Sequence, residues 1–183
     1  MFIKIKDLEL RKIEFDETFA PRVIDLGEEV TQKGAIKAAG RAELVEEARD
    51  AGQVVKDIRV VGSFSLAVEM RCARCLDPVS DSLSESFDLL YRPQGVDARG
   101  DDASIGPAET EIGYYQGEGM QLEDVLKEQI LLALPAKEVC SPGCKGLCPH
   151  CGRNLNLERC DCAVTLADPR WGALEEIRKK LEP

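Results

Sequence analysis

The placement of its cysteines constrains this chain more than any other feature of the sequence. Six of the eight cysteines fall between Cys140 and Cys162, and the other two form an isolated Cys-x-x-Cys pair at Cys72 and Cys75. Two thiolates spaced in this way can reach one metal ion, and eight thiolates match two tetrahedral sites with four sulfur ligands each. We therefore predict that every cysteine is a metal ligand: Cys72, Cys75, Cys140, Cys144, Cys148, Cys151, Cys160 and Cys162.

The strongest metal-binding signal is the segment Cys-Pro-His-Cys-Gly at 148–152. Its proline favours a sharp turn between the two thiolates, and its glycine permits a tight exit from that turn. Cys160 and Cys162 follow after a short loop and can complete a site of four thiolates. The second site would then combine the four cysteines that remain: Cys72, Cys75, Cys140 and Cys144.

Other arrangements of the same thiols stay open. The four cysteines between 140 and 151 could form one site and leave Cys160 and Cys162 to meet the upstream pair. We prefer the first grouping, because a knuckle usually pairs with the next knuckle along a ribbon. His150 could replace one cysteine as a ligand. Disulfides are a further alternative. A thioredoxin-like redox pair at Cys72 and Cys75 is another, although such a pair normally opens a helix and the residues at 76–78 are typical of a turn.

Composition is that of a soluble globular protein in a reducing compartment. The hydrophobic fraction is 44%, the charged fraction is 32%, and no apolar run is long enough to cross a membrane. The first ten residues alternate apolar and charged side chains, which is not typical of an export signal. Eight cysteines in such a chain favour metal binding, and we predict two zinc ions, although the sequence does not distinguish zinc from iron.

The sequence contains no recognisable catalytic constellation. His150 is its only histidine, so a Ser-His-Asp or Cys-His arrangement would have to be built inside the cysteine-rich turn. No glycine-rich phosphate-binding motif is present, and a four-thiolate zinc site has no open position for a substrate. We therefore predict a protein that is not an enzyme and has no small-molecule substrate.

Alternating apolar and polar residues predict an α+β fold, with a mainly antiparallel, barrel-like β meander and one packed helix. Strands are expected at 2–6, 13–15, 35–45, 54–70 and 79–91, with a bulge or break at Gly62. The residues at 26–32 are ambiguous and could form a short helix. A loop is expected over about 92–119, with a short strand at 112–115. The clearest helix spans 122–134, and a short terminal helix is expected after Asp168.

Charge divides the chain into an acidic β-rich body, 1–136, and a tail, 137–183, that holds a zinc ribbon and the terminal helix. The net charge is −10, yet the tail carries eight Lys and Arg against seven Asp and Glu. Because phosphate repels an acidic surface, RNA contact is expected in the tail, whereas the body could face a basic protein. The candidate contact residues are Lys145, Arg153, Arg159, Arg170, Arg178, Lys179 and Lys180.

Four stretches together carry a family resemblance: Arg71–Leu76, the helix end at 130–135, Cys144–Asn156 and Asp168–Trp171. They resemble the YceD family, the large ribosomal RNA subunit accumulation proteins. The resemblance implies a bacterial cytoplasmic protein, with plastid relatives, that supports accumulation or processing of this RNA by binding RNA or a ribosomal protein. It implies no catalytic residues. An alternative function, based on the thiols alone, is a zinc-dependent redox-sensing regulatory module.

Overall fold

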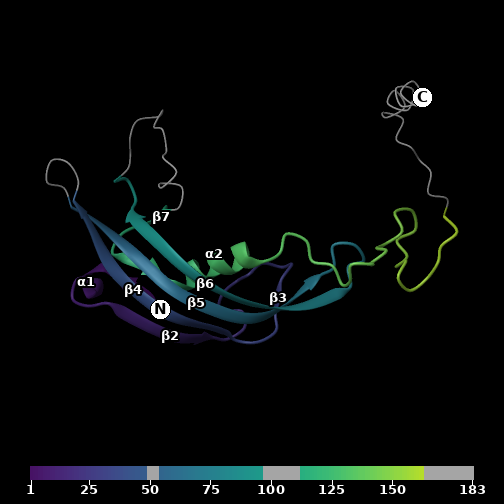
Figure 1. Cartoon of the computed structure of the whole chain (residues 1–183), viewed down its shortest axis with the longest axis horizontal. Coiled ribbons are helices and arrows are strands. Elements are labelled where there is room, and N and C mark those ends of the chain that lie inside the picture. The colour runs from purple at the N-terminus through teal and green to yellow at the C-terminus, as the bar shows by residue number, and fades with distance from the viewer. Residues whose placement is uncertain (49–53, 97–111, 163–183) are drawn as a thin grey trace, which may run out of the picture.

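Three long antiparallel strands dominate the computed structural model, which describes residues 1–48, 54–96 and 112–162. They are β4 (Ile36–Ala48), β5 (Val54–Arg71) and β6 (Pro78–Pro93), joined in that order in one sheet. β2 (Ile13–Phe19) extends the sheet beside β4, and β7 (Ile112–Tyr115) pairs in parallel with β6. Figure 1 shows the sheet curving along its length, with the cysteine-rich segment beyond one end.

Shorter elements complete the fold. β3 (Thr31–Gln32) pairs with β5, and β1 (Phe2–Lys4) pairs with β8 (Gly119–Gln121) in a separate two-stranded sheet. α1 (Ile5–Leu8) follows β1, and α2 (Leu122–Ala133) follows β8. The β1–β8 pairing therefore places the N-terminal segment beside the start of the longer helix.

The main hydrophobic core includes residues from one face of the large sheet and from α2. Even-numbered β5 residues from Ile58 to Val68 supply much of the sheet side, because side chains at alternate positions point to the same face. α2 contributes Leu122, Leu126 and Ile130, all fully buried, at the helical spacing expected from the sequence. Burial of this apolar face holds the helix and the sheet together.

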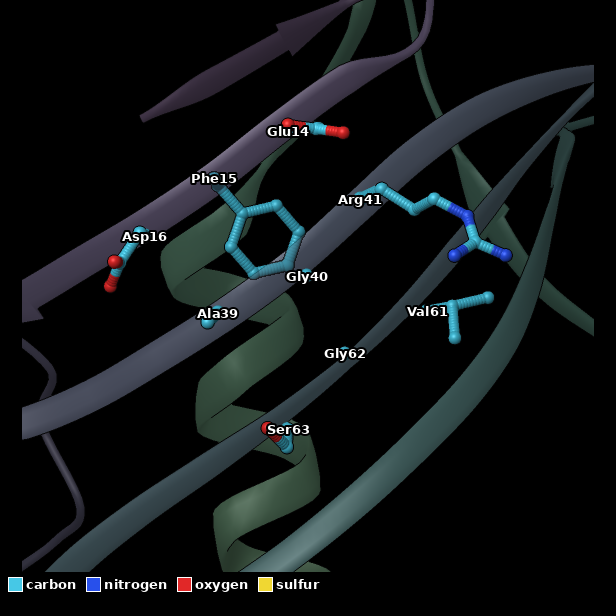
Figure 2. Close-up of a pocket in the computed structure, with 9 residues that line it drawn as sticks. All are labelled: Glu14, Phe15, Asp16, Ala39, Gly40, Arg41, Val61, Gly62 and Ser63. Atoms are coloured by element: carbon cyan, nitrogen blue, oxygen red, sulfur yellow. The ribbon is translucent and has the colours of Figure 1, made fainter.

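A row of four residues crosses the large sheet and includes two facing glycines. Phe15, Gly40, Gly62 and Phe87 are successive cross-strand partners on β2, β4, β5 and β6. A Cβ on Gly40 would lie 2.7 Å from the tip of the Phe15 ring and 2.3 Å from the Val61 carbonyl oxygen. Figure 2 shows the Phe15 ring directed across the strand boundary toward Gly40. The two glycines thus leave room for the two aromatic rings.

This row makes Gly40 sensitive to substitution. We expect Gly40→Val to lower the free energy of unfolding by about 2 kcal/mol, because the added atoms meet backbone and ring atoms that cannot move independently. Urea denaturation would measure the change. Ala39→Val is the matched control, since Ala39 is the exposed neighbour on the same strand. A similar loss in both variants would show that crowding in this row is not responsible.

A buried ion pair lies on the opposite face of the sheet. Asp57 precedes Ile58, so its side chain points away from the main core, yet Asp57 is 1% exposed and Arg92 is 5% exposed. Arg92 Nη2 donates to Asp57 Oδ2 at 2.8 Å, and Arg92 Nε donates to Asp57 Oδ1 at 3.1 Å. Arg92 Nη2 also donates to Glu47 Oε2 at 2.5 Å. The pair joins β4, β5 and β6 at the end of the sheet farthest from the cysteines.

The structure confirms the predicted α+β class, the long strands, the short strand at 112–115 and the helix that begins at Leu122. The ambiguous stretch at 26–32 does not form the short helix that was considered: it is irregular up to Val30 and then forms β3. A break at Gly62 is wrong, because the β4–β5–β6 register continues through it. β4 continues to Ala48 instead of ending at 45, and residues 5–8 are helical. The pairing of β7 with β6 makes the large sheet mixed rather than wholly antiparallel.

Some predicted features lie outside the described residues. The terminal helix expected after Asp168 falls within 163–183, and much of the expected loop falls within 97–111. Within the described part of the chain, neither helix combines the length and apolarity needed to span a bilayer.

Candidate metal centres

The upstream cysteine pair forms a tight turn between the end of β5 and the start of β6. The Cys72 backbone N–H donates to the Asp77 carbonyl at 2.8 Å, and the Leu76 N–H donates to the Cys72 carbonyl at 3.0 Å. Leu76 has a φ of +63°, a left-handed conformation that lets the chain reverse after Cys75. This geometry places both sulfurs on the inner side of the turn, where both side chains are buried.

Four sulfurs meet at this turn. Cys140 and Cys144, which follow α2, bring their sulfurs to within 4.8 Å of those of Cys72 and Cys75. The Cys72–Cys144 sulfur distance is 3.8 Å and the Cys75–Cys140 distance is 3.6 Å. Four sulfurs around a zinc ion at its usual bond length would be separated by about 3.8 Å. These four residues, hereafter the first tetrad, therefore suit a tetrahedral metal ion.

The second tetrad comprises Cys148, Cys151, Cys160 and Cys162, whose sulfurs also lie within 4.8 Å of one another. The Cys148 N–H donates to the Arg153 carbonyl at 2.8 Å, and the Gly152 N–H donates to the Cys148 carbonyl at 2.9 Å. Gly152 has a φ of +72°, the left-handed conformation that glycine adopts at low cost. Cys148 is buried, whereas Cys151 is exposed. The second tetrad is thus more open to solvent than the first.

The backbone of each knuckle favours the thiolate form of its first cysteine, whereas hydrogen bonds to other sulfurs and burial raise the pKa of Cys162. Backbone N–H groups, first that of Cys140 and then that of Cys75, lower the pKa of the Cys72 thiol to about 6. The N–H groups of Cys151 and His150 likewise lower the pKa of Cys148 to about 6. A hydrogen bond to sulfur stabilises its charged form, and only the thiolate is a good metal ligand. The first cysteine of each knuckle is therefore prepared for metal binding by the backbone around it.

Hydrogen bonds join the two tetrads to each other and to the sheet. The Leu147 N–H donates to the Arg74 carbonyl at 3.0 Å, and Arg74 Nη1 donates to the Cys144 carbonyl at 2.9 Å. Gly146 lies against this contact, since a Cβ at that position would be 3.0 Å from the Arg74 carbonyl oxygen. The Ala73 N–H also donates to the Glu138 carbonyl at 2.8 Å. The tail is consequently attached to the β5–β6 turn through its backbone as well as through the cysteines.

Two asparagines organise the loop between the tetrads. Asn156 donates through Nδ2 to the Cys144 sulfur at 3.3 Å and accepts from the Lys145 N–H at 2.8 Å. This contact is the main cause of the lowered pKa of Cys144. Asn154 donates to Asp77 Oδ2 at 2.9 Å and so ties the loop to the β5–β6 turn. The sequence predicts only a short loop before Cys160 and does not indicate these supporting contacts, which join residues apart in the chain.

The structure brings the sulfurs together in the grouping that the sequence analysis preferred, and not in the grouping of Cys140 with Cys151. His150 is exposed and belongs to neither tetrad. Of the candidate contact residues, Lys145, Arg153 and Arg159 are exposed on the tail, and Arg153 forms a 3.7 Å surface ion pair with Glu158. The others lie outside the described residues: Arg170, Arg178, Lys179 and Lys180.

Comparison with known proteins identifies the same family that the sequence motifs resemble. A family model described as large ribosomal RNA subunit accumulation protein YceD matches residues 60–178. An uncharacterized protein of Mycobacterium tuberculosis is 32% identical over 124 residues, which cover 68% of this chain and 57% of the relative. The Arabidopsis thaliana protein named large ribosomal RNA subunit accumulation protein YCED homolog 1, chloroplastic, is 22% identical over 148 residues, 69% of this chain and 46% of the relative.

A Zea mays protein of the same name is 26% identical over 128 residues, 57% of this chain and 44% of the relative. The chain therefore spans about half the length of the curated relatives that it matches. No solved structure gives a significant match.

Proposed function

Because the chain belongs to the YceD family, we propose that it supports the accumulation of large-subunit ribosomal RNA as a binding factor that performs no chemistry. The observation that carries this proposal is the extent of the family match, residues 60–178, which includes every cysteine of both tetrads. Two relatives bear names that state this role for their own proteins. The expected setting is the bacterial cytoplasm.

We further propose that each tetrad binds one zinc ion. Four sulfurs at the separations of a tetrahedral site fit zinc or iron, and zinc is the ion most often held in closed four-thiolate sites. A closed site leaves no open position for water or substrate, so the metal would act as a structural cross-link. The two ions would hold the loop from 140 to 162 in one conformation and fix the positions of its exposed basic side chains.

The tail is the surface that we propose contacts ribosomal RNA. Lys145, Arg153 and Arg159 are exposed on the loop that the metal ions would order. Within 140–162 these three bases outnumber two acids, Glu158 and Asp161, whereas the body is strongly acidic. A cation that neutralises a phosphate releases counterions, which makes the binding weaken as salt is added.

A charge-reversal experiment tests the tail. We expect Arg153→Glu/Arg159→Glu to fail to restore large-subunit RNA in a strain that lacks the protein, although native mass spectrometry should show full metal content. In vitro, the purified variant should bind ribosomal RNA more weakly. The slope of log affinity against log salt concentration should become shallower by about 0.7 to 0.9 for each phosphate that the variant no longer neutralises.

The matched control is Lys37→Glu/Arg41→Glu, which makes the same change in charge on the exposed face of β4. Full RNA levels with the tail variant would reject the tail as the contact surface. An equal defect in both variants would instead indicate a general effect of net charge.

A further inference from the structure

A small pocket in the acidic body has aromatic walls. Its cavity of about 330 Å³ lies among β1, the end of β6, β7, β8 and α2. All three tyrosines of the chain line it, together with the exposed Phe2: Tyr91, Tyr114 and Tyr115. Tyr91 and Tyr115 are buried, whereas Tyr114 is 50% exposed and Phe2 is 42% exposed. The pocket thus has two aromatic side chains in its interior and two that are partly open to solvent.

Two carboxylates flank these rings. Asp124 and Glu128 are one helical turn apart on α2, both are exposed, and both line the pocket. Burial raises the pKa of Tyr91, and the nearby Glu128 carboxylate raises it further through its charge and a hydrogen bond. The pocket therefore presents negative charge close to the aromatic rings, and its residues include no Lys, Arg or His among the described ones.

Two cations of neighbouring segments, the N-terminal amine and Lys127, are paired with other carboxylates, whereas Lys4 on β1 forms no ion pair among the described residues. The N-terminal amine forms an ion pair with Glu123, and Lys127 Nζ lies 4.0 Å from Asp25. Neither interaction involves the pocket carboxylates. The negative charge of Asp124 and Glu128 is thus not neutralised by any of the ion pairs found in the described part of the chain.

We propose that this pocket binds an arginine side chain of a basic protein partner. A guanidinium group stacks on tyrosine or phenylalanine faces, pairs with carboxylates through its fixed set of N–H donors, and is more weakly hydrated than an ammonium group. The cavity is large enough for such a group, and the body around it is acidic. This surface is separate from the tail, so the inference goes beyond the proposed RNA contact and can fail without it.

Fluorine NMR provides a direct test, because the three tyrosines all report on the pocket. The full chain labelled with 3-fluorotyrosine would be titrated with N-acetyl-arginine amide and, separately, with its neutral isostere N-acetyl-citrulline amide. We expect saturable shifts of the tyrosine signals with the arginine compound and at least about fivefold weaker binding of the citrulline compound. The arginine affinity should also fall as salt is added.

Variants of the exposed lining residues then locate the site. Asp124→Asn/Glu128→Gln and Phe2→Ala should each weaken arginine binding by about three- to tenfold. Asp81→Asn/Glu85→Gln on β6 is the matched control, because it removes two carboxylates that do not line the pocket. Equal binding of arginine and citrulline, or equal weakening by the control pair, would overturn the proposal. An absence of saturable shifts in the unmodified protein would also overturn it.

Discussion

Replacing Cys72 with serine is expected to remove one of the two proposed metal ions and to destabilise both the body and the tail. The first tetrad takes two ligands from the β5–β6 turn and two from the segment after α2, and Cys72 itself is fully buried. A structural zinc site can contribute much of the folding free energy of a small domain. We expect the midpoint of thermal unfolding to fall by more than about 10 °C in reducing buffer.

Replacing Cys148 with serine should have a different result. The second tetrad lies wholly within 148–162, so loss of its ion should unfold this segment and leave the sheet intact. Native mass spectrometry would count the ions in each variant. Hydrogen exchange would show whether protection is lost in β5 as well as in the tail, or in the tail alone.

His150→Ser is the matched control for both cysteine variants, because His150 is exposed in the same knuckle and belongs to neither tetrad. It should keep two ions and an unchanged melting temperature. Equal loss of β5 protection in the Cys72 and Cys148 variants would contradict the separation of the two sites. A single ion in the unmodified protein would contradict the proposal of two.

Removal of the buried carboxylate at position 57 should cause the second large effect. We expect Asp57→Ala to lower the free energy of unfolding by about 3 kcal/mol, because Arg92 would lose its closest buried acceptor in a region that excludes water. Chemical denaturation would measure this change. The variant should keep both proposed metal ions, since Asp57 lies near the start of β5, whereas the Cys72 turn follows the other end of that strand.

Glu47→Gln is the matched control for this pair. Glu47 also accepts from Arg92, but its side chain is 47% exposed, so water can replace part of the interaction. We expect a decrease in the free energy of unfolding of at most about 1 kcal/mol. If the two variants were equally destabilised, burial of Asp57 would not be the source of the effect.

The sequence by itself determined the features that depend on neighbouring residues. Periodic apolar positions identified the long strands and α2, because each pattern needs only one buried face. The spacing of the cysteines indicated two knuckles and further thiols nearby, and the family resemblance followed from the same short motifs. These signals are local, so they can be recognised without knowing how distant segments meet.

The tertiary structure decided which distant groups meet. It brought Cys72 next to Cys144, 72 residues away in the chain, placed Asn156 against the Cys144 sulfur, and brought Asp57 next to Arg92. It also kept Gly62 within a continuous strand, where Gly62 and the facing Gly40 leave room for the rings of Phe15 and Phe87. Each outcome depends on strand register and on loops that return to the sheet, and no local pattern encodes register between strands. For this reason the ligand types could be predicted from the sequence, whereas their supporting contacts and the aromatic pocket could not.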